Sequence, residues 1–476
     1  MDQPRCQPTI DPMQSEGLAA AVDKMRAAQV DEVAIRTFAH YYGELERGAT
    51  GMIPEESIEP VDIPRLADAE VSDEEATAAI AATAVIKLNG GLGTSMGMDH
   101  AKSLLGVRGG LSFLDVIARQ ILHLRETYGT RLPLIFMNSF RTSAETLEAI
   151  APYSGLASAG LPLEFLQNME PRLLADGLTP VAWPQDPDLE WCPPGHGDIY
   201  TALRGTGLLD TLLEQGFARV FVSNSDNLGA VPDAHVAGWF AGSGAPFAIE
   251  AVRRTPSDRK GGHFARRRSD GRLVLRETAQ TLPEDQKALQ DLTRHRYCST
   301  NNLWIDLQAL KDALDARDGI LGLPMIRNEK TVDPSDPATP KVIQVETAMG
   351  SAIEVFEGAQ LVEVGRDRFI PVKTTNDLLV LRSDVYEIRD GYTLDQVADE
   401  VPFIDLDGSY YKLVADFEAR FPEGAPSLAK ATALRIQGDW TFGGAVQILG
   451  EVELVAEDEQ CVEAGTVLAD HTITPA

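Results

Sequence analysis

The sequence is poor in cysteine and has no long apolar run. Its four cysteines, Cys6, Cys192, Cys298 and Cys461, lie far apart and form no C-x-x-C pair. This spacing predicts reduced thiols that bind no metal, as is usual for a cytoplasmic protein. No apolar stretch approaches the ~20 residues that a membrane-spanning helix needs. The N-terminal stretch MDQPRCQPTIDPMQSEG lacks the apolar segment of a secretory signal.

Basic residues are also scarce. Lysine and arginine together number 42, against 72 aspartate and glutamate residues, which gives a formal net charge of -30. An acidic surface of this kind repels nucleic acid and anionic membranes, so neither is an expected partner. Any nucleotide must therefore bind in a local basic pocket. Because no long block of like charge occurs, we interpret the charge as serving solubility rather than as an acidic interaction tail.

The length and the apolar content are those of a multidomain globular protein. The chain has 476 residues, of which 44% are hydrophobic and 24% charged, enough for a large core and two or three domains. Residues 1–80 are expected to form a helical segment, with a helix over 11–48. In that helix, apolar residues recur at the helical period, namely Ala34, Phe38, Tyr41, Tyr42 and Leu45.

Residues 81–390 alternate between strand and helix patterns and are expected to form the main domain. Strands are predicted from Ala84, over 132–139 and within the stretches LEFLQN, ARVFVSNSD, APFAIEAV and KVIQVE. A helix is predicted after Ser112, with Asp115 completing a capping box. This alternation predicts an α/β fold with a mostly parallel sheet covered on both faces. Ligands of such sheets bind at the carboxyl ends of the strands.

Residues 391–476 have a different sequence pattern. Apolar and polar residues alternate from Leu434 to Leu454, and glycines such as Gly438 and Gly450 interrupt them. Short strands between frequent turns indicate a small β-helix with an imperfect repeat. Since no catalytic constellation is visible there, we expect this region to serve packing or subunit contact.

The stretch from Ala84 to Val107, AVIKLNGGLGTSMGMDHAKSLLGV, is the strongest local signal. A predicted strand runs into a glycine-rich turn and then reaches Lys102, and such turns present backbone N–H groups to phosphates. No Gly-Lys-Ser/Thr follows the first glycines, which excludes a Walker A loop. Gly91, Gly93 and Gly97 miss the G-x-G-x-x-G spacing of a dinucleotide site by one residue. The pattern predicts a longer phosphate-facing loop ending in a lysine, with an ordinary glycine-rich loop as the alternative.

Three further stretches place polar residues near the ends of predicted elements. In WCPPGHGDIYTAL, His196 lies in a turn before a helix that Asp198 is expected to cap. In ARVFVSNSDNLGA, Asn224 and Asp226 follow a strand, and a lone carboxylate suits Mg²⁺, which keeps water and substrate phosphates as its other ligands. In RFIPVKTTNDLLVL, Lys373 precedes a helix N-terminus, where a cation is disfavoured unless an anionic ligand lies between them. A capped turn, an Asx turn and a solvated lysine remain the simpler interpretations.

Taken together and in this order, the stretches resemble the eukaryotic-type UTP–glucose-1-phosphate uridylyltransferases. The matching stretches are LNGGLGTSMG with AKSLL, FLQNMEPRL, WCPPGHGDIY, VSNSDNLGA, KGG, TNNLWI, VETAMGSAIEVF and RFIPVKTTNDLLVL. Each is modest alone, but the ordered set is specific and runs from about residue 30 to the end. The resemblance implies a Rossmann-like (GT-A-like) nucleotidyltransferase domain with a mixed sheet over 81–390. It also implies an N-terminal helical segment and a C-terminal left-handed β-helix.

The resemblance further implies an activity and a Mg²⁺ cofactor. UMP would pass from UTP to glucose-1-phosphate, giving UDP-glucose and pyrophosphate, by in-line attack of the sugar phosphate on the α-phosphorus. The family motifs place Lys102 and Lys373 at the reacting phosphates as catalytic residues, and Asp226 on the metal. The implied nucleotide-binding residues are Leu88, Asn89, Gly90, Gly91, Gln167, Gly195, His196, Asn224 and Asp226, and the implied sugar-phosphate-binding residues are Gly262, Asn302 and Glu346.

Some departures and alternatives accompany the resemblance. Ser299 stands where the family usually has asparagine, and Met169 and Glu170 replace residues that are often basic or aromatic. The same chemistry on galactose-1-phosphate or N-acetylglucosamine-1-phosphate stays open, because sugar epimers differ by few hydrogen bonds. A non-catalytic nucleotide-sugar sensor is the other alternative, although both lysines and the metal carboxylate are present. Self-association through the C-terminal domain is a further expectation.

Overall fold

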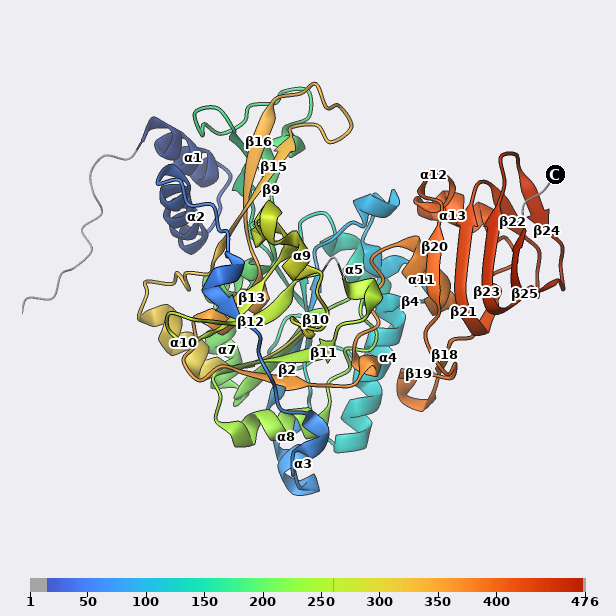
Figure 1. The fold of residues 1–476 in the computed structure, drawn as a ribbon. Coiled ribbons are helices and arrows are strands. Elements are labelled where there is room, and N and C mark those ends of the chain that lie inside the picture. The colour runs from blue at the N-terminus through green and yellow to red at the C-terminus, as the bar shows by residue number, and fades with distance from the viewer. Residues whose placement is uncertain (1–14, 260, 474–476) are drawn as a thin grey trace, which may run out of the picture.

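A seven-stranded sheet forms the centre of the molecule (Figure 1). The computed structural model describes residues 15–259 and 261–473, so Cys6 and Lys260 lie outside the described part of the chain. All neighbouring strands pair in parallel except β14, which is antiparallel to both of its neighbours. This confirms an α/β fold with a mixed sheet. In spatial order the strands are β17 (Gln360–Glu363), β11 (Phe247–Arg253), β14 (Tyr297–Asp306), β10 (Arg219–Asn224), β2 (Thr83–Asn89), β5 (Leu134–Asn138) and β6 (Glu164–Leu166).

The two faces of the sheet pack against separate apolar cores. Successive residues of a strand alternate between them: Val85 belongs to one core, and Ala84 and Ile86 to the other. The first core is covered by α3 (Asp73–Ala81), α4 (Phe113–Tyr128), α5 (Ser143–Ile150), α8 (Ala234–Ser243) and α11 (Thr375–Arg382). The second is covered by α6 (Ile199–Gly205), α7 (Leu208–Glu214), α10 (Leu307–Asp315) and the 3-10 turn Met349–Glu354.

Local sequence signals account for helix boundaries in this layer. Ser112 Oγ accepts the Asp115 N–H over 3.2 Å and the Asp115 carboxylate accepts the Ser112 N–H over 2.8 Å, so the predicted capping box is confirmed at α4. The same reciprocal pair forms at α3 between Ser72 and Glu75. Gly129 ends α4 with φ of 59°, a left-handed conformation that favours glycine.

The N-terminal region predicted to be helical over 11–48 contains two helices, and residues 11–14 of that prediction lie outside the described part of the chain. The two helices are α1 (Glu16–Ala27) and α2 (Glu32–Glu46). Gln29 adopts φ of 60° between them, and the Asp31 carboxylate caps α2 by accepting the Val33 N–H over 2.8 Å. The apolar stripe was therefore identified correctly, but the cap inside the segment was missed.

Smaller sheets surround the centre. The predicted strand KVIQVE lies outside the main sheet, in an antiparallel sheet that packs on α1 and α2. That sheet consists of β15 (Met325–Thr331), β16 (Lys341–Thr347) and β8 (Leu173–Leu174). The other small pairings are β1 (Ile58–Glu59) with β12 (His263–Arg267) and β13 (Leu273–Arg276), β7 (Glu170–Pro171) with β9 (Trp191–Cys192), β3 (Gly106–Arg108) with β4 (Leu111–Ser112), and β18 (Tyr386–Ile388) with β19 (Leu394–Gln396). The short helix α9 (Gln286–Leu289) follows β13.

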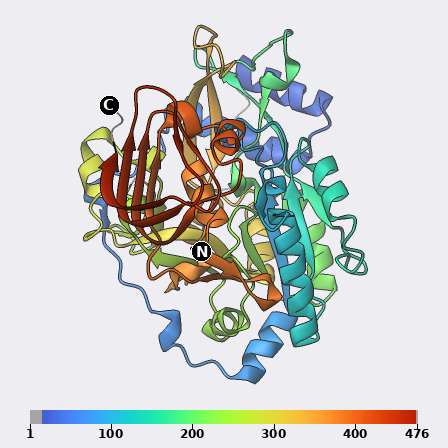
Figure 2. The ribbon, with the colours of Figure 1, turned by 90° about the vertical axis from the view of Figure 1, so that its right-hand side faces the viewer.

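The C-terminal region is a stack of parallel strands, which Figure 2 shows side by side. Two short helices lie between its first and second strands, and their junction contacts the main domain, because Leu413 Cδ2 lies 3.0 Å from where a Cβ on Gly97 would be. One apolar core includes residues on both sides of residue 390, so a boundary at 390/391 stays a prediction. The elements are β20 (Phe403–Leu406), α12 (Gly408–Tyr411), α13 (Val414–Arg420), β21 (Ser427–Gln437), β22 (Trp440–Phe442), β23 (Gln447–Val455), β24 (Gln460–Val462) and β25 (Val467–Ile473).

The mixed orientation of the sheet gathers polar residues at one edge. β2 and β10 end there at Asn89 and Asn224, whereas β14 begins there with Tyr297 and runs the opposite way. Residues from two strand ends and one strand start therefore meet. Among the helices of the described residues, none is long and apolar enough to cross a bilayer.

Candidate functional site

Two strands and a loop build the first part of the site. β2 and β10 are aligned with Leu88 opposite Asn224, and the Ser225 N–H donates to the Leu88 carbonyl over 3.1 Å. After β2 the chain turns through Gly93 and Gly97, whose φ angles of 67° and 74° lie in the left-handed region. The stretch is thus a loop and not the opening of a helix.

Asn89, the last residue of β2, is held by the protein itself. Its amide donates to Asn138 Oδ1 and to Thr146 Oγ1, both over 2.8 Å, and only 4% of the residue is exposed. The side chain fixes the start of the loop. Because both hydrogens of its amide are already donated within the protein, Asn89 can contact a nucleotide only through its backbone as long as these two hydrogen bonds are kept.

Gly90 and Gln167 lie against each other. A Cβ atom on Gly90 would lie 2.2 Å from Gln167 Oε1, so a larger residue here would displace this amide from its observed position. The Gln167 N–H donates to the Asn138 carbonyl over 2.8 Å, which holds the glutamine beside β5. A Cβ on Gly91 would meet nothing within 4 Å. One side of the loop is thus open, with the predicted base-recognising glutamine next to it.

Lys102 and Asp226 form an ion pair of 2.6 Å, with side chains 16% and 22% exposed. The Lys102 N–H donates to the Gly91 carbonyl over 3.2 Å, and its ammonium also donates to the Val372 carbonyl. The Val372 N–H in turn donates to the Asp226 carbonyl over 3.0 Å. The loop after β2, the end of β10 and the segment before Lys373 are therefore joined at one point.

Lys373 is exposed beside this junction. Its backbone N–H donates to Asp377 Oδ2 over 2.8 Å, next to the Thr374 cap of α11. The Lys373 ammonium opposes the increase in the pKa of Glu277 that burial causes. Glu277, which the sequence analysis did not identify, thus lies within electrostatic reach of the predicted catalytic lysine.

Glu277 also marks the position of Gly262. A Cβ on Gly262 would lie 2.6 Å from Glu277 Oε2 and 2.9 Å from the Arg276 carbonyl. The predicted sugar-binding glycine therefore packs tightly on the end of β13, and Lys373 acts on the same carboxyl group. Glu277 itself was not predicted, because it lies in the ordinary stretch Arg276, Glu277, Thr278, which shows no recognisable motif.

The turn at Gly195 and His196 is joined to the end of β16. A Cβ on Gly195 would lie 2.5 Å from the Thr347 carbonyl and 3.1 Å from Glu346 Cβ, so this turn too requires glycine. His196 Nδ1 accepts the Met349 N–H over 3.0 Å, which leaves the ring proton on Nε2. The structure brings the predicted base-side and sugar-side residues of these two stretches together, with an imidazole N–H as a donor.

The prediction that Asp198 caps the following helix is wrong. The backbone of Asp198 is helical, and its carboxylate accepts the Asn168 N–H over 2.6 Å and the Asn168 amide over 2.9 Å. Burial raises the pKa of Asp198 to about 6. The residue therefore ties the turn at His196 to the segment carrying Gln167, and long-range pairing replaces the local cap.

Asn302 lies near the middle of β14 (Tyr297–Asp306), in a buried ionic network. Glu250 accepts two bonds from Arg368, over 2.7 and 2.6 Å, one from the Asn302 amide over 2.9 Å and one from Trp304 Nε1 over 2.9 Å. Asn302 Oδ1 is buried without a protein partner. Glu250 and Arg368 were missed, although a carboxylate inside the apolar strand APFAIEAV was a usable signal.

Lys87 is a second buried charge that the sequence analysis passed over. It is 1% exposed, and its ammonium donates to the Ala230 carbonyl over 2.7 Å. Burial and the nearby Arg368 lower the pKa of Lys87 to about 7. It belongs to β2, one residue before Leu88, and its ammonium also lies over the Phe221 ring.

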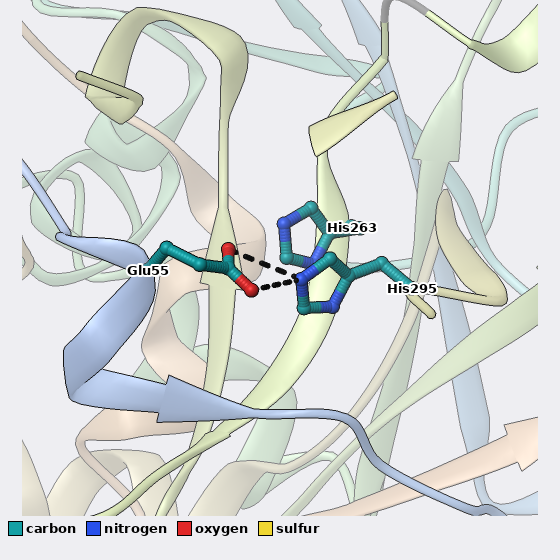
Figure 3. A group of neighbouring side chains, drawn as sticks. All are labelled: Glu55, His263 and His295. Atoms are coloured by element: carbon teal, nitrogen blue, oxygen red, sulfur yellow. Dashed lines mark hydrogen bonds and ion pairs between the residues drawn. The ribbon is translucent and has the colours of Figure 1, made fainter. Parts of the chain in front are cut away.

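Glu55, His263 and His295 form a cluster whose donor atoms lie close together (Figure 3). The imidazole rings stack at 3.7 Å with 20° between their planes. A metal ion bonds along a nitrogen lone pair in the ring plane, about 2.0–2.1 Å away for zinc, and two nearly parallel planes cannot both contain it at that distance. Arg276 and Arg294 also donate to Glu55. The cluster is therefore structural.

The arrangement at the sheet edge suits an anionic ligand. Lys102 and Lys373 lie beside an open loop; the Asp226 carboxylate pairs with Lys102, and the Glu277 carboxyl group lies within electrostatic reach of Lys373. One carboxylate such as that of Asp226 is enough to hold a Mg²⁺ ion that is bound mainly through substrate phosphates. Gln167 offers hydrogen bonds that suit a planar base, and the Nε2–H of His196 is a donor that suits a ribose or phosphate oxygen. Together these groups are suited to bind a nucleotide and to neutralise charge on its phosphates.

Known proteins are similar to this chain in sequence and in fold. A family model described as UTP–glucose-1-phosphate uridylyltransferase matches residues 35–449. A protein of Schizosaccharomyces pombe, described as a probable UTP–glucose-1-phosphate uridylyltransferase, is 39% identical over 397 residues, which are 82% of this chain and 77% of that protein. The barley (Hordeum vulgare) enzyme of that name is 39% identical over 378 residues, or 78% and 77% of the two chains.

Solved structures agree with these matches. A variant of the UDP-glucose pyrophosphorylase from Leishmania major, in complex with UDP-glucose, superposes with a TM-score of 0.92 at 42% identity. That superposition covers 97% of this chain and all of the other. The Trypanosoma brucei protein gives a TM-score of 0.91 at 40% identity, with 97% and 100% covered.

Proposed function

This chain belongs to the UTP–glucose-1-phosphate uridylyltransferase family, and on that premise we propose which of its groups perform the reaction. The enzyme transfers UMP from UTP to glucose-1-phosphate and releases pyrophosphate, giving UDP-glucose. An oxygen of the sugar phosphate attacks the α-phosphorus of UTP while the bond to the pyrophosphate leaving group breaks. The attacking oxygen is already ionised near neutral pH, so no general base is required.

The junction of Lys102, Asp226 and Val372 carries the proposal. Two anionic substrates must meet, and positioning together with charge neutralisation is the main contribution of a protein to such a transfer. Lys102 is fixed between the loop and β10 by the Gly91 carbonyl and by Asp226. Lys373 follows Val372 directly. We assign both ammonium groups to the reacting phosphates, as the catalytic residues.

The nucleotide side is assigned to the loop and the two turns beside it. Gln167 and Gly195 recognise uracil in this proposal, and His196 donates from Nε2 to the ribose or phosphate. Because the Asn89 amide is already bonded within the protein, we assign it a backbone contact only. The open loop backbone, with Asn224 opposite, completes the nucleotide side, which comprises Leu88, Asn89, Gly90, Gly91, Gln167, Gly195, His196, Asn224 and Asp226.

The sugar side is assigned to Gly262, Asn302 and Glu346. Gly262 lies beside Glu277 in the neighbourhood of Lys373, and Glu346 lies against Gly195. Asn302 has an amide oxygen without a protein partner, which a sugar hydroxyl could use. The three residues are therefore distributed around the base-side turn and the catalytic lysines.

We also propose Mg²⁺ as the cofactor, held by Asp226. Lys102 engages Oδ2 of this carboxylate, so Oδ1 is the oxygen that would bind the ion, with substrate phosphates as further ligands. When bound, Mg²⁺ would neutralise charge on the phosphates. The donor chemistry fits, because a single hard oxygen ligand beside a phosphate loop suits this ion.

Other parts of the proposal rest on the family resemblance. These are the GT-A-like classification of the main domain, a left-handed course of the C-terminal coils, self-association through that region and a cytoplasmic location. The parallel pairing of β20, β21, β23 and β25 supports a coil structure. Analytical ultracentrifugation of the full chain and of a Phe403→Glu variant would test whether this region joins subunits.

Pyrophosphate release tests the activity. UTP, glucose-1-phosphate and Mg²⁺ should give rapid release, whereas galactose-1-phosphate, N-acetylglucosamine-1-phosphate or TTP in place of the natural partner should give little. Faster release with another sugar would retain the chemistry and change the substrate. UTP binding by calorimetry without release from any pair would indicate a nucleotide-sugar sensor instead.

A further inference from the structure

Arg254 follows β11 and begins the segment that leads to Gly262. It is 7% exposed, so its guanidinium lies inside the protein and not at the surface of the site. Its backbone N–H donates to the Arg296 carbonyl over 2.8 Å, which fixes the start of the segment against the residue just before β14. Burial lowers the pKa of Arg254, yet an arginine remains charged in a protein.

The guanidinium is bonded to backbone carbonyls on two sides. Nη1 donates to Leu289 over 2.8 Å and to His295 over 3.1 Å. Nη2 donates to Asp258 and Arg259, both over 3.1 Å, and to Gly261 over 3.2 Å. One buried cation thus gathers three carbonyls of the loop after β11 and joins them to the segment after α9. Charge-assisted bonds of this type are roughly twice as strong as neutral ones.

The same loop is held through its side chains by the segment that carries the catalytic lysine. The Asp258 carboxylate accepts from Thr255 and from Arg366, in the latter case over 2.8 Å. Arg366 lies in the 3-10 turn Arg366–Arg368, which precedes Lys373. The loop after β11 is therefore fixed relative to that lysine.

The position of Gly262 depends on these bonds. Gly261 is its direct neighbour, and on its other side the Gly262 Cα packs on the end of β13, where a Cβ would lie 2.6 Å from Glu277 Oε2. Gly262 is thus confined between the carbonyls bound by Arg254 and the Glu277 carboxyl group. A shift of the loop by an ångström would displace Gly262 relative to Lys373.

We propose that Arg254 is a positioning residue for glucose-1-phosphate. It holds the Gly262 loop in place from within the protein and does not touch the substrate. This inference rests on the proposed assignment of Gly262 to the sugar phosphate. Because the loop holds no residue assigned to UTP, the effect of Arg254 is confined to one of the two substrates.

The test compares steady-state kinetics of Arg254→Met, Arg254→Lys and the control Arg253→Met, with each substrate varied in turn. Arg253 is the neighbouring residue, but its side chain is 55% exposed and pairs with Glu363 at the surface. We expect Arg254→Met to raise the KM for glucose-1-phosphate about tenfold or more, since small displacements weaken positioning strongly. The KM for UTP should change less than about twofold, and Arg253→Met should match the wild type. Lysine, which keeps the charge with fewer donors, should give an intermediate KM.

Calorimetric UTP binding and a thermal melt on the same preparations show that the variants are folded. An unchanged KM for glucose-1-phosphate in folded Arg254→Met, or equal increases in both KM values, would overturn the proposal. If Arg254→Met does not fold, Arg254→Lys decides, and a wild-type KM for glucose-1-phosphate in that variant would overturn it. A wild-type enzyme that forms no UDP-glucose would overturn the assigned activity itself, and this inference with it.

Discussion

Lys102 and Asp226 form an ion pair of 2.6 Å although 124 residues separate them in the sequence. The pair joins the glycine-rich loop to the end of β10 at the edge of the sheet. In the absence of substrate the carboxylate balances the ammonium, and a nucleotide phosphate would compete for that ammonium. The site is thus electrostatically balanced before the substrates add their own charge.

Lys102→Ala and Lys373→Ala should each lower kcat by about 10²-fold, because each ammonium is assigned to charge that develops on the phosphates. Pyrophosphate release at saturating substrate measures this loss. Lys341→Ala is the matched control, since that lysine is 71% exposed and pairs with Glu329 at the surface. Wild-type turnover in both single variants would refute the catalytic assignment.

Asp198→Asn should raise the KM for UTP by about tenfold, because an amide cannot accept both bonds from Asn168 and the Gln167 segment loosens. The pKa of Asp198 is raised to about 6, so the carboxylate is ionised at pH 7.5 and becomes protonated as the pH falls below 6. The wild-type KM for UTP should therefore rise between pH 7 and 5. This rise should be larger than any rise that Asp198→Asn shows over the same pH range.

Asp188→Asn, in an exposed turn with 66% of its side chain accessible, controls for the change of charge. Its KM for UTP should follow the wild-type pH profile. An Asp198→Asn enzyme whose KM for UTP equals the wild-type value at pH 7.5 would contradict the role assigned to this carboxylate.

His263 should make the fold sensitive to acid. Burial, with the His295 ring beside it, lowers the pKa of His263 to about 2 from an ordinary value of 6.5. The unfolded chain binds the proton first, so stability is complete above pH 6.5 and declines as the pH falls toward the folded pKa. By pH 5 the loss is about 2 kcal/mol.

Replacement by phenylalanine keeps a stacked ring and removes the titration. His263→Phe should therefore lose less in thermal midpoint between pH 7 and 5 than the wild type. His123→Phe, at an exposed position of α4, should lose as much as the wild type. Equal losses in His263→Phe and the wild type would show that this imidazole does not control the acid response.

Arg368→Met should destabilise the protein by about 3–5 kcal/mol, because it leaves the Glu250 carboxylate buried without its bidentate partner. The Glu250 side chain is fully buried and that of Arg368 is 10% exposed. Thermal unfolding measures the change. Replacing both residues, as Glu250→Leu with Arg368→Met, should recover part of the loss.

A surface pair provides the comparison. Arg389 pairs with Glu387 and Asp395 while 54% of its side chain is exposed, so Arg389→Ala should cost less than about 1 kcal/mol. If Arg368→Met were no more harmful than Arg389→Ala, the buried network would not stabilise the part of β14 around Asn302 and Trp304.

Patterns confined to neighbouring residues were predicted well from the sequence. The Ser112–Asp115 capping box and the loop after Ala84 depend on spacing alone, and the structure confirms both. Asp198 was assigned to a local cap because the sequence shows only its neighbours, whereas its partner Asn168 lies 30 residues earlier. The carboxylate of Glu250 inside an apolar strand was a usable signal, but its partner could not be predicted, because Arg368 lies 118 residues later in the sequence.

The stretch KVIQVE illustrates a different limit. Its composition predicts a strand, and β16 is one, but composition does not say which sheet a strand joins. β16 joins the smaller antiparallel sheet because it pairs with β15 and packs on α1 and α2. The break between α1 and α2 was missed for a different reason, because the Asp31 cap is a local signal that lies inside one continuous apolar stripe.

The bond from Lys102 to the Val372 carbonyl spans 270 residues. During synthesis, residue 102 leaves the ribosome long before residue 372 exists, so the nascent chain carries the lysine without the carbonyl that orients it. A product truncated between Glu363 and Val372 keeps all seven strands of the central sheet but has an unfinished site. UDP-glucose formation should therefore report translation past Val372 and closure of the fold at that point.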